Sequence, residues 1–342
     1  MKSYPERFQN IGRPLPEFRK GGTSLTYFTT VTGDMPAQEM GHCQPHEHVY
    51  IVETPALLTH PELRLTNLAA SIEELKLYRI AGGTTLVDAN PLATGRDALA
   101  LQEASLTSGV KIISSTGYHI PVFYRPDHWI WTASEETLTD LFVRELTEGM
   151  FLGGCYQWPK YQTSIKAGLV KAMLTEEGVS GRTETLLRAA GQAAVIGKAS
   201  LMLHTEYGKG ALEAIELLRE LGLAPDQILI CHVDRQANDY RIHEKIADTG
   251  VFLEYDTITL FEFHDNEAEI QLLEHMLQRG YEKQLLLSTD PTADRLKSYG
   301  GSVGMDYLLT VFLPMLEDHG FSQKLLQTIT RENPIRALCK RT

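Results

Sequence analysis

Residues 200–232 read SLMLHTEYGKGALEAIELLRELGLAPDQILICH and contain the repeating unit of the fold. A short apolar run, SLMLH, is followed by an amphipathic segment that closes on Gly222, and a second apolar run, QILICH, comes next. Parallel strands that helices cover on both faces have this short, apolar character. Because a glycine commonly follows the last turn of a helix, the stretch predicts a strand, a helix and a second strand.

The same alternation continues along the chain, with further helices predicted in 71–82 and 96–109. The predicted strands are 42–50, 83–89, 110–117, 167–173, 200–204, 227–232, 250–255 and 284–289. Eight alternations in about 300 residues favour a closed (β/α)8 barrel, the TIM-barrel architecture of the α/β class, over a doubly wound open sheet, which remains the alternative. No linker rich in Pro, Gly or Ser is present, so we expect one domain spanning 1–342. We expect a short N-terminal cap in 1–41 and a helical excursion in 118–165.

Composition narrows the class of ligand and the cellular setting. The 342 residues are 43% hydrophobic and 22% charged, as in ordinary globular proteins, and the net charge is -12. Without a cluster of Lys and Arg, this charge argues against nucleic acid and favours a small-molecule substrate. The start MKSYPERFQN lacks the apolar region of a signal peptide, and no apolar stretch approaches the roughly 20 residues of a membrane span. Four scattered cysteines without a CxxC pair fit reduced thiols, so we expect a cytoplasmic protein that does not bind membranes.

Polar residues fall at the carboxyl ends of the predicted strands, where a barrel of this kind builds its active site. The candidate metal ligands are His46, His48, Lys171, His204, His232 and Asp290. Side chains two apart on a strand face the same side, so the two histidines of PHEHVY can bind one cation together. A set rich in imidazole with one carboxylate favours zinc or a similar transition metal over Ca²⁺ or Mg²⁺.

Lys171 lies in the apolar run AGLVKAM, where an ammonium carries a heavy desolvation cost and the neutral amine is favoured. A neutral amine reacts with carbon dioxide to form a carbamate, whose two oxygens can bridge two cations as a carboxylate would. A lysine that reaches solvent, or that pairs with an acid, is the alternative at this point.

The flanking residues add a family resemblance. HxH on the first strand, AGLVK around the lysine, HTEYG after the fifth strand, CHVDR at the sixth and STD at the eighth resemble the phosphotriesterase family of the amidohydrolase superfamily, over about residues 30–338. The resemblance implies that two zinc-like ions are bound and bridged by carbamylated Lys171. It places His46 and His48 on the more buried ion with Asp290.

The same resemblance places His204 and His232 on the more exposed ion. It also implies that a hydroxide shared by the two ions is the nucleophile, since coordination lowers the pKa of water to roughly 7. Asp290 then accepts the proton, so this residue is both a ligand and catalytic. A homodimer is compatible with the family.

A narrower resemblance, carried by HVDR and DPTADRLKSYGG, points to the branch that opens sugar lactones, including phosphorylated ones. The resemblance to the family as a whole implies that a tyrosine at the barrel mouth assists catalysis, and Tyr118 in STGYH is placed for this role. The implied substrate contacts are Arg235, Arg295, Lys297 and Tyr299. Glu262 departs from the pattern, because it stands where related phosphosugar lactonases carry a basic residue. A neutral sugar lactone therefore stays open as the substrate.

Three other functions compete with the lactonase hypothesis. A phosphotriesterase or another ester hydrolase would use the same ligands, and a catalytically silent barrel would have lost some of them. A single-metal deaminase conflicts with Lys171, because such a site needs no bridging ligand. Strand alternation also predicts that Cys43 and Cys231 turn away from the barrel axis and pack against helices.

Overall fold

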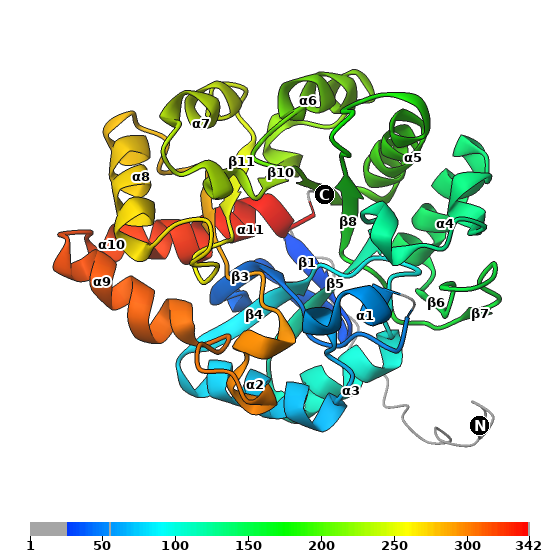
Figure 1. Cartoon of the computed structure of the whole chain (residues 1–342), viewed down its shortest axis with the longest axis horizontal. Coiled ribbons are helices and arrows are strands. Elements are labelled where there is room, and N and C mark those ends of the chain that lie inside the picture. The colour runs from blue at the N-terminus through cyan, green and yellow to red at the C-terminus, as the bar shows by residue number, and fades with distance from the viewer. Residues whose placement is uncertain (1–25, 55, 341–342) are drawn as a thin grey trace, which may run out of the picture.

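The computed structural model describes residues 26–54 and 56–340 (Figure 1). An N-terminal cap was predicted for 1–41, and its residues 1–25 lie outside the described part of the chain. Its remainder forms an antiparallel hairpin of β1 (Tyr27–Thr30) and β2 (Gly33–Pro36). Phe28 of this hairpin is fully buried, and the backbone N–H of Lys340 donates to Tyr27 O at 2.7 Å. The hairpin therefore joins the two ends of the described chain.

Eight parallel strands form one sheet, in the order β12-β11-β10-β9-β8-β5-β4-β3. The strands are β3 (His42–Glu47), β4 (Gly83–Asp88), β5 (Lys111–Gly117), β8 (Leu169–Met173), β9 (Ser200–His204), β10 (Ile228–Cys231), β11 (Phe252–Tyr255) and β12 (Leu285–Leu287). The backbone N–H of Asp290 donates to His46 O at 3.2 Å, and Ser288 Oγ accepts from His46 N at 2.8 Å. These contacts join the last strand to the first, so the predicted (β/α)8 barrel is confirmed, and each strand lies within its predicted range.

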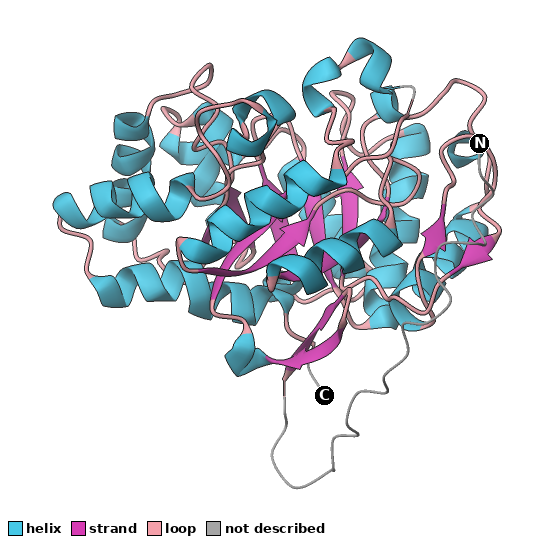
Figure 2. Cartoon of the chain, turned by 90° about the horizontal axis from the view of Figure 1, so that it is seen from below, coloured by secondary structure: helices cyan, strands magenta, loops and turns pink. Residues whose placement is uncertain are grey.

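Helices surround the sheet (Figures 1 and 2). They are α2 (Leu68–Ile80), α3 (Ala98–Ser108), α4 (Glu135–Thr147), α5 (Gly181–Gly197), α6 (Ala211–Glu220), α7 (Tyr240–Ala247) and α8 (Asn266–Gln278), with α1 (Ala56–Thr59) in a loop and α9 (Leu313–Asp318), α10 (Gln323–Gln327) and α11 (Asn333–Leu338) at the C-terminus. Local signals set their ends: the Asp97 side chain accepts the N–H groups of Leu99 and Ala100, and Gly109 ends α3 with φ +75°. Within the described part of the chain, none of the helices has the length and apolar character of a membrane span.

The segment 118–165 after the third barrel strand contains α4 and a small hairpin. Its strands are β6 (Phe151–Leu152) and β7 (Tyr161–Gln162). Glu145 of α4 forms a buried ion pair with Arg96 at 2.7 Å and also accepts the N–H of Phe151. The predicted helical excursion is therefore present and is fixed to the barrel wall.

The inside of the barrel is an apolar layer with one or two side chains from each strand. It includes Val87, Ile113, Leu169, Met202, Leu229 and Leu286, all at most 1% exposed. Cys43 and Cys231 belong to this layer, so the prediction that they turn away from the axis is wrong. The pairing of β3 with β4 shifts between Gln44 and Glu47, and His232 has a left-handed backbone with φ +61°. Both irregularities interrupt the period of two that the prediction assumed.

Candidate metal centre

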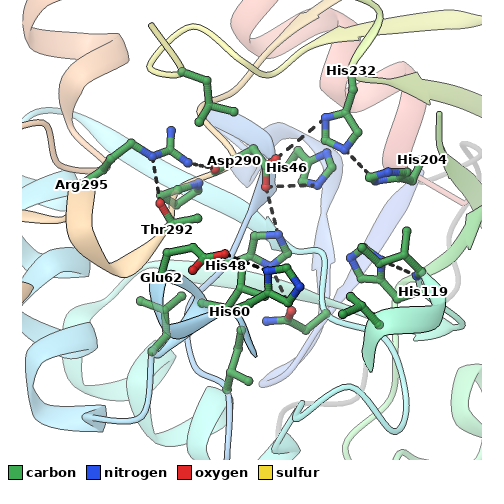
Figure 3. Close-up of a pocket in the computed structure, with 18 of the residues that line it drawn as sticks. His46, His48, His60, Glu62, His119, His204, His232, Asp290, Thr292 and Arg295 are labelled. Carbon is green, nitrogen blue, oxygen red and sulfur yellow. Dashed lines mark hydrogen bonds and ion pairs between the residues drawn. The ribbon is translucent and has the colours of Figure 1, made fainter. Parts of the chain in front are cut away.

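A cavity of about 270 Å³ lies at the carboxyl ends of the barrel strands. Five of the predicted ligands line it: His46, His48, His204, His232 and Asp290 (Figure 3). His204 Nδ1 lies 2.8 Å from His232 Nε2. On the other side of the cavity, His48 Nε2 lies 3.0 Å from Asp290 Oδ1, and His46 Nε2 lies 3.7 Å from the same oxygen. Ring nitrogens and carboxylate oxygens from four strands therefore converge on one space.

Asp256, which follows β11, holds two of these histidines from behind. Its Oδ2 lies 2.8 Å from His46 Nδ1, and its Oδ1 lies 2.8 Å from His232 Nδ1. Oδ1 also accepts the backbone N–H of His232 at 3.1 Å. A carboxylate that accepts an imidazole N–H fixes the tautomer, so the lone pair on Nε2 of His232 faces the cavity. The contact of Asp256 with His46 is an ion pair without hydrogen-bond geometry.

The other two histidines are held in the same way. His48 Nδ1 lies 2.9 Å from Asn90 Oδ1, and His204 Nε2 lies 3.0 Å from Glu206 Oε1. In each case the nitrogen that faces the cavity is the one without this outer partner. Four oriented imidazoles with outer acceptors are the arrangement that proteins use for metal ligands.

Lys171 of β8 reaches the same space from below. Its Nζ lies 3.2 Å from His46 Nε2, 3.1 Å from Met202 Sδ and 3.8 Å from Cys231 Sγ. The side chain is fully buried, and within residues 26–54 and 56–340 no carboxylate oxygen lies within 4 Å of Nζ. An unpaired ammonium in such a place costs several kcal/mol. Among the described residues, neither alternative considered from the sequence, contact with solvent or pairing with an acid, is found.

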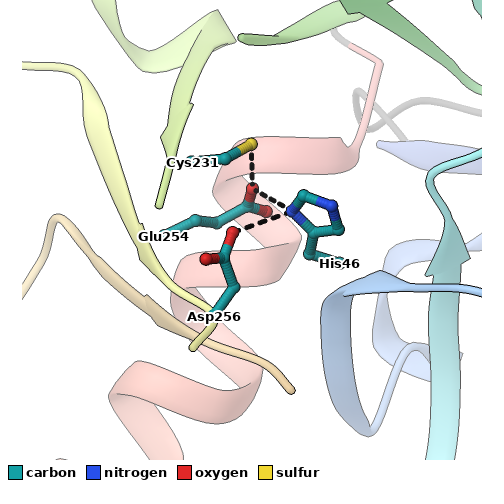
Figure 4. Close-up of side chains that lie close together, drawn as sticks. All are labelled: His46, Cys231, Glu254 and Asp256. Atoms are coloured by element: carbon teal, nitrogen blue, oxygen red, sulfur yellow. Dashed lines mark hydrogen bonds and ion pairs between the residues drawn. The ribbon is translucent and has the colours of Figure 1, made fainter. Parts of the chain in front are cut away.

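Two buried carboxylates, Glu254 and Asp256, lie beside His46 (Figure 4). Glu254 Oε2 accepts from Cys231 Sγ at 2.9 Å and lies 3.5 Å from His46 Nδ1. Burial raises the pKa of Glu254 to about 8. Burial, together with the charges of Asp234 and Glu254, raises the pKa of Asp256 well above its usual range. This concentration of acidic groups behind imidazoles fits bound cations, because positive charge in the cavity would stabilise the ionised carboxylates.

Asp290, just after β12, is held differently. Burial acts to raise its pKa, but the imidazoles of His46 and His48 outweigh burial and hold the pKa well below its usual range. Its backbone is left-handed, with φ +41°, which is uncommon for a residue with a side chain. Arg295 stabilises this turn, because its Nη2 donates to Asp290 O and its Nη1 to Thr289 O at 3.2 Å.

The predicted substrate contacts divide into two groups. Arg235 and Arg295 line the cavity. Lys297 and Tyr299 are not among its lining residues: Lys297 Nζ pairs with Asp306 at 2.6 Å, and the Tyr299 hydroxyl donates to Asn67 O at 2.8 Å. The geometry therefore gives no support for substrate contacts by Lys297 or Tyr299.

Tyr118 is also not among the cavity-lining residues. It is fully buried, and its hydroxyl donates to Met173 O at 2.9 Å. Its neighbour His119 lines the cavity instead. Gly117 breaks the strand alternation here, because it has φ +101° and approaches β8 so closely that a Cβ would lie 1.9 Å from Lys171 O. The catalytic role predicted for Tyr118 has no support in this geometry.

Several residues of the site were not predicted from the sequence. They are Asn90, His119, Glu206 and Asp256 around the histidines, and His60 and Glu62 at the outer wall. The rule that polar residues matter at strand ends would have found Asn90 and Asp256, which follow the second and seventh barrel strands.

Known proteins resemble this chain over most of its length. The model of the phosphotriesterase family matches residues 26–338. A phospho-furanose lactonase from Mycoplasmopsis synoviae is 31% identical over 323 residues, which cover 90% of each chain. Among solved structures, an amidohydrolase from Mycoplasma synoviae matches with a TM-score of 0.86, 28% identity and 92% of each chain covered. A lactonase from Listeria monocytogenes matches with a TM-score of 0.83 and 27% identity, covering 92% of this chain and 100% of that one. The chain therefore belongs to the phosphotriesterase family.

Proposed function

We propose that this protein is a dinuclear metal-dependent hydrolase that opens sugar lactones. The observation that carries the proposal is the convergence of four oriented imidazoles and Asp290 on one cavity, with the unpaired Lys171 beneath them. Its relatives include proteins named as lactonases, so hydrolysis of an ester bond in a ring is the reaction that fits best.

In this proposal one cation is held by His46, His48 and Asp290, and the second by His204 and His232. Carbamylated Lys171 would contribute to holding both, and the modification would give its buried Nζ a negatively charged group in place of an ammonium. Nitrogen-rich donors favour zinc. When bound, two such ions supply a water molecule activated near neutral pH and a Lewis acid for the ester carbonyl.

The protein's own groups move the proton and orient the substrate. Asp290 Oδ2 is directed toward the open cavity, 3.8 Å from His232 Nδ1 and 3.9 Å from Arg235 Nη2, where it can accept a proton as the ester is attacked. Arg235 is fixed by an ion pair of 2.8 Å to Glu206 and lies 5.0 Å from the centre of the Phe263 ring. It is therefore a preorganised donor for a carbonyl or ring oxygen.

The size of the cavity favours a small ring over a bulky ester. At about 270 Å³ it lies just below the range of roughly 300 to 1,000 Å³ that is usual for small-molecule sites. A five-membered sugar lactone fits a space of this size better than a phosphotriester with three large groups. The phosphotriesterase activity considered from the sequence is therefore ranked second to the lactonase activity.

The test is a panel of substrates given to the protein loaded with zinc. It contains sugar lactones, a nitrophenyl phosphotriester and a simple amide at equal concentrations. We expect kcat/KM to be highest for a sugar lactone. Faster turnover of the phosphotriester than of every lactone would reject the proposal in favour of the second candidate.

We further propose a cytoplasmic location. Among the described residues Cys43, Cys155, Cys231 and Cys339 are all free thiols, which suits a reducing compartment. The homodimer suggested by the family remains a prediction.

A further inference from the structure

Two glutamates line the cavity in addition to the candidate metal ligands. Glu62 belongs to the short helix Pro61–Leu63 that follows β3 and α1, and Glu262 belongs to the loop after β11. Both line the cavity. Glu62 pairs with His60 Nδ1 at 3.0 Å, whereas Glu262 is exposed and has no ion pair within 4 Å in the part of the chain that the structure describes. Figure 3 shows Glu62 beside His60, on the same side of the cavity as Thr292 and Arg295.

Most donors of the two arginines that line the cavity are already engaged by the protein. Arg295 donates from Nε to Thr292 Oγ1 at 3.1 Å, from Nη1 to Thr259 Oγ1 and Thr289 O, and from Nη2 to Asp290 O. A guanidinium has five N–H donors, so little of its planar fork remains for a bidentate phosphate contact.

Arg235 is engaged in part. One of its nitrogens pairs with Glu206 at 2.8 Å, another lies 3.9 Å from Asp290, and the guanidinium packs over the Phe263 ring, while its buried Nε has no hydrogen-bond partner among the described residues. Its charge is balanced within the protein, and its position beside Asp290 suits the reacting ester more than the far end of a substrate.

From these contacts we infer that the substrate is an uncharged, polyhydroxylated lactone that carries no phosphate. Glu62 and Glu262 accept hydrogen bonds from its hydroxyl groups and repel an anionic group at the same position. This inference rests on the proposed lactonase function and adds the charge of the substrate to it.

The expected size of the effect follows from charge and exposure. A phosphate monoester carries about 1.5 to 2 negative charges at pH 7. In water, the interaction between two unit charges about 4 Å apart changes a binding constant by roughly fivefold. Since Glu262 is exposed, salt screens much of this repulsion. We therefore expect the protein to prefer the neutral lactone by about fivefold to twentyfold at low ionic strength, and by less at high salt.

The experiment compares a five-membered sugar lactone with the same lactone phosphorylated at its primary hydroxyl, using the full-length protein loaded with zinc. Two quantities are measured for each member of the pair: kcat/KM for ring opening, and the Kd of the corresponding hydroxy acid by calorimetry. The key variant is Glu62→Gln combined with Glu262→Gln, and the matched control is Glu103→Gln on the exposed face of α3.

The inference predicts that wild type favours the neutral member in both measurements, that the double variant loses most of this preference by gaining affinity for the phosphorylated member, and that Glu103→Gln changes neither. Stronger binding or faster opening of the phosphorylated member by wild type would overturn the inference and leave the lactonase proposal intact. If neither lactone is opened, the proposed function fails, and the Kd values of the two acids still decide which charge the cavity prefers.

Discussion

The carboxylate of Asp256 contacts one histidine of each proposed cation site. A substitution of Asp256 is therefore expected to change the metal affinity of the two sites differently. Its Oδ1 accepts both the backbone N–H and Nδ1–H of His232, at 3.1 and 2.8 Å, and its Oδ2 lies 2.8 Å from His46 Nδ1. In Asp256→Asn, the carbonyl oxygen of the amide will face His232, since a backbone N–H can only donate. The amide NH₂ then faces His46.

Next to that NH₂, Nδ1 of His46 must carry a lone pair instead of a proton. The proton of the ring therefore moves to Nε2, the nitrogen that faces the cavity. The ring can no longer bind a cation through Nε2 without losing this contact. Loss of such an outer partner typically costs about 10- to 100-fold in metal affinity. We therefore expect one zinc site to weaken by this factor, while the site of His204 and His232 keeps its affinity.

The assay is a titration of zinc-loaded protein with a chelator of known affinity, with zinc per chain measured by mass spectrometry. Asp256→Asn should release one ion early and the second at the wild-type chelator concentration, whereas Asp256→Ala should weaken both sites. Asp34→Asn, at an exposed position of strand β2, is the matched control. Equal weakening of both sites in Asp256→Asn, or no change, would refute this reasoning.

Three further predictions test other parts of the site. Lys171→Ala should lose metal and activity together and regain part of its rate with added acetate or propionate and excess zinc. Lys171→Met should resist rescue because its side chain fills the space, and an Ala variant that keeps two ions without added acid would contradict the bridging role. Asp290→Asn should lower kcat by about 10²-fold or more with a much smaller change in KM, and near-normal turnover would mean that another group accepts the proton. Burial acts to lower the pKa of His264, but the carboxylates of Asp234 and Glu269, 3.8 and 3.4 Å from its Nε2, raise the pKa from 6.5 to about 9. A raised pKa stabilises the fold below pH 6.5 and ceases to do so as the pH passes 9, so the Tm advantage of wild type over His264→Asn should shrink across this window, and an advantage that grows with pH would contradict the assignment.

The barrel and its ligands could be predicted from the sequence because they rest on strong local signals. Short apolar runs mark strands that are buried on both faces, and the strand-end rule places chemistry at one edge of the barrel. His204 ends such a run and Asp290 lies shortly after another, so their position required no knowledge of tertiary contacts. The alternation Phe252, Glu254, Asp256 would also have placed both acids inside the barrel.

The errors arose where the backbone departs from regular geometry. The register shift after Gln44, the left-handed His232 and the left-handed Gly117 each interrupt the regular strand backbone, and a period of two cannot show this. Lys297 and Tyr299 lie in an irregular loop after the last strand, where no periodicity indicates which side chains face the cavity.

The claim that two cations share this cavity is tested most directly by anomalous X-ray diffraction from crystals of the zinc-loaded protein. We predict two anomalous peaks about 3.5 to 4 Å apart. One should lie against His46, His48 and Asp290, the other against His204 and His232, with additional density on Lys171 Nζ between them. A single peak beside an unmodified lysine would contradict the dinuclear site.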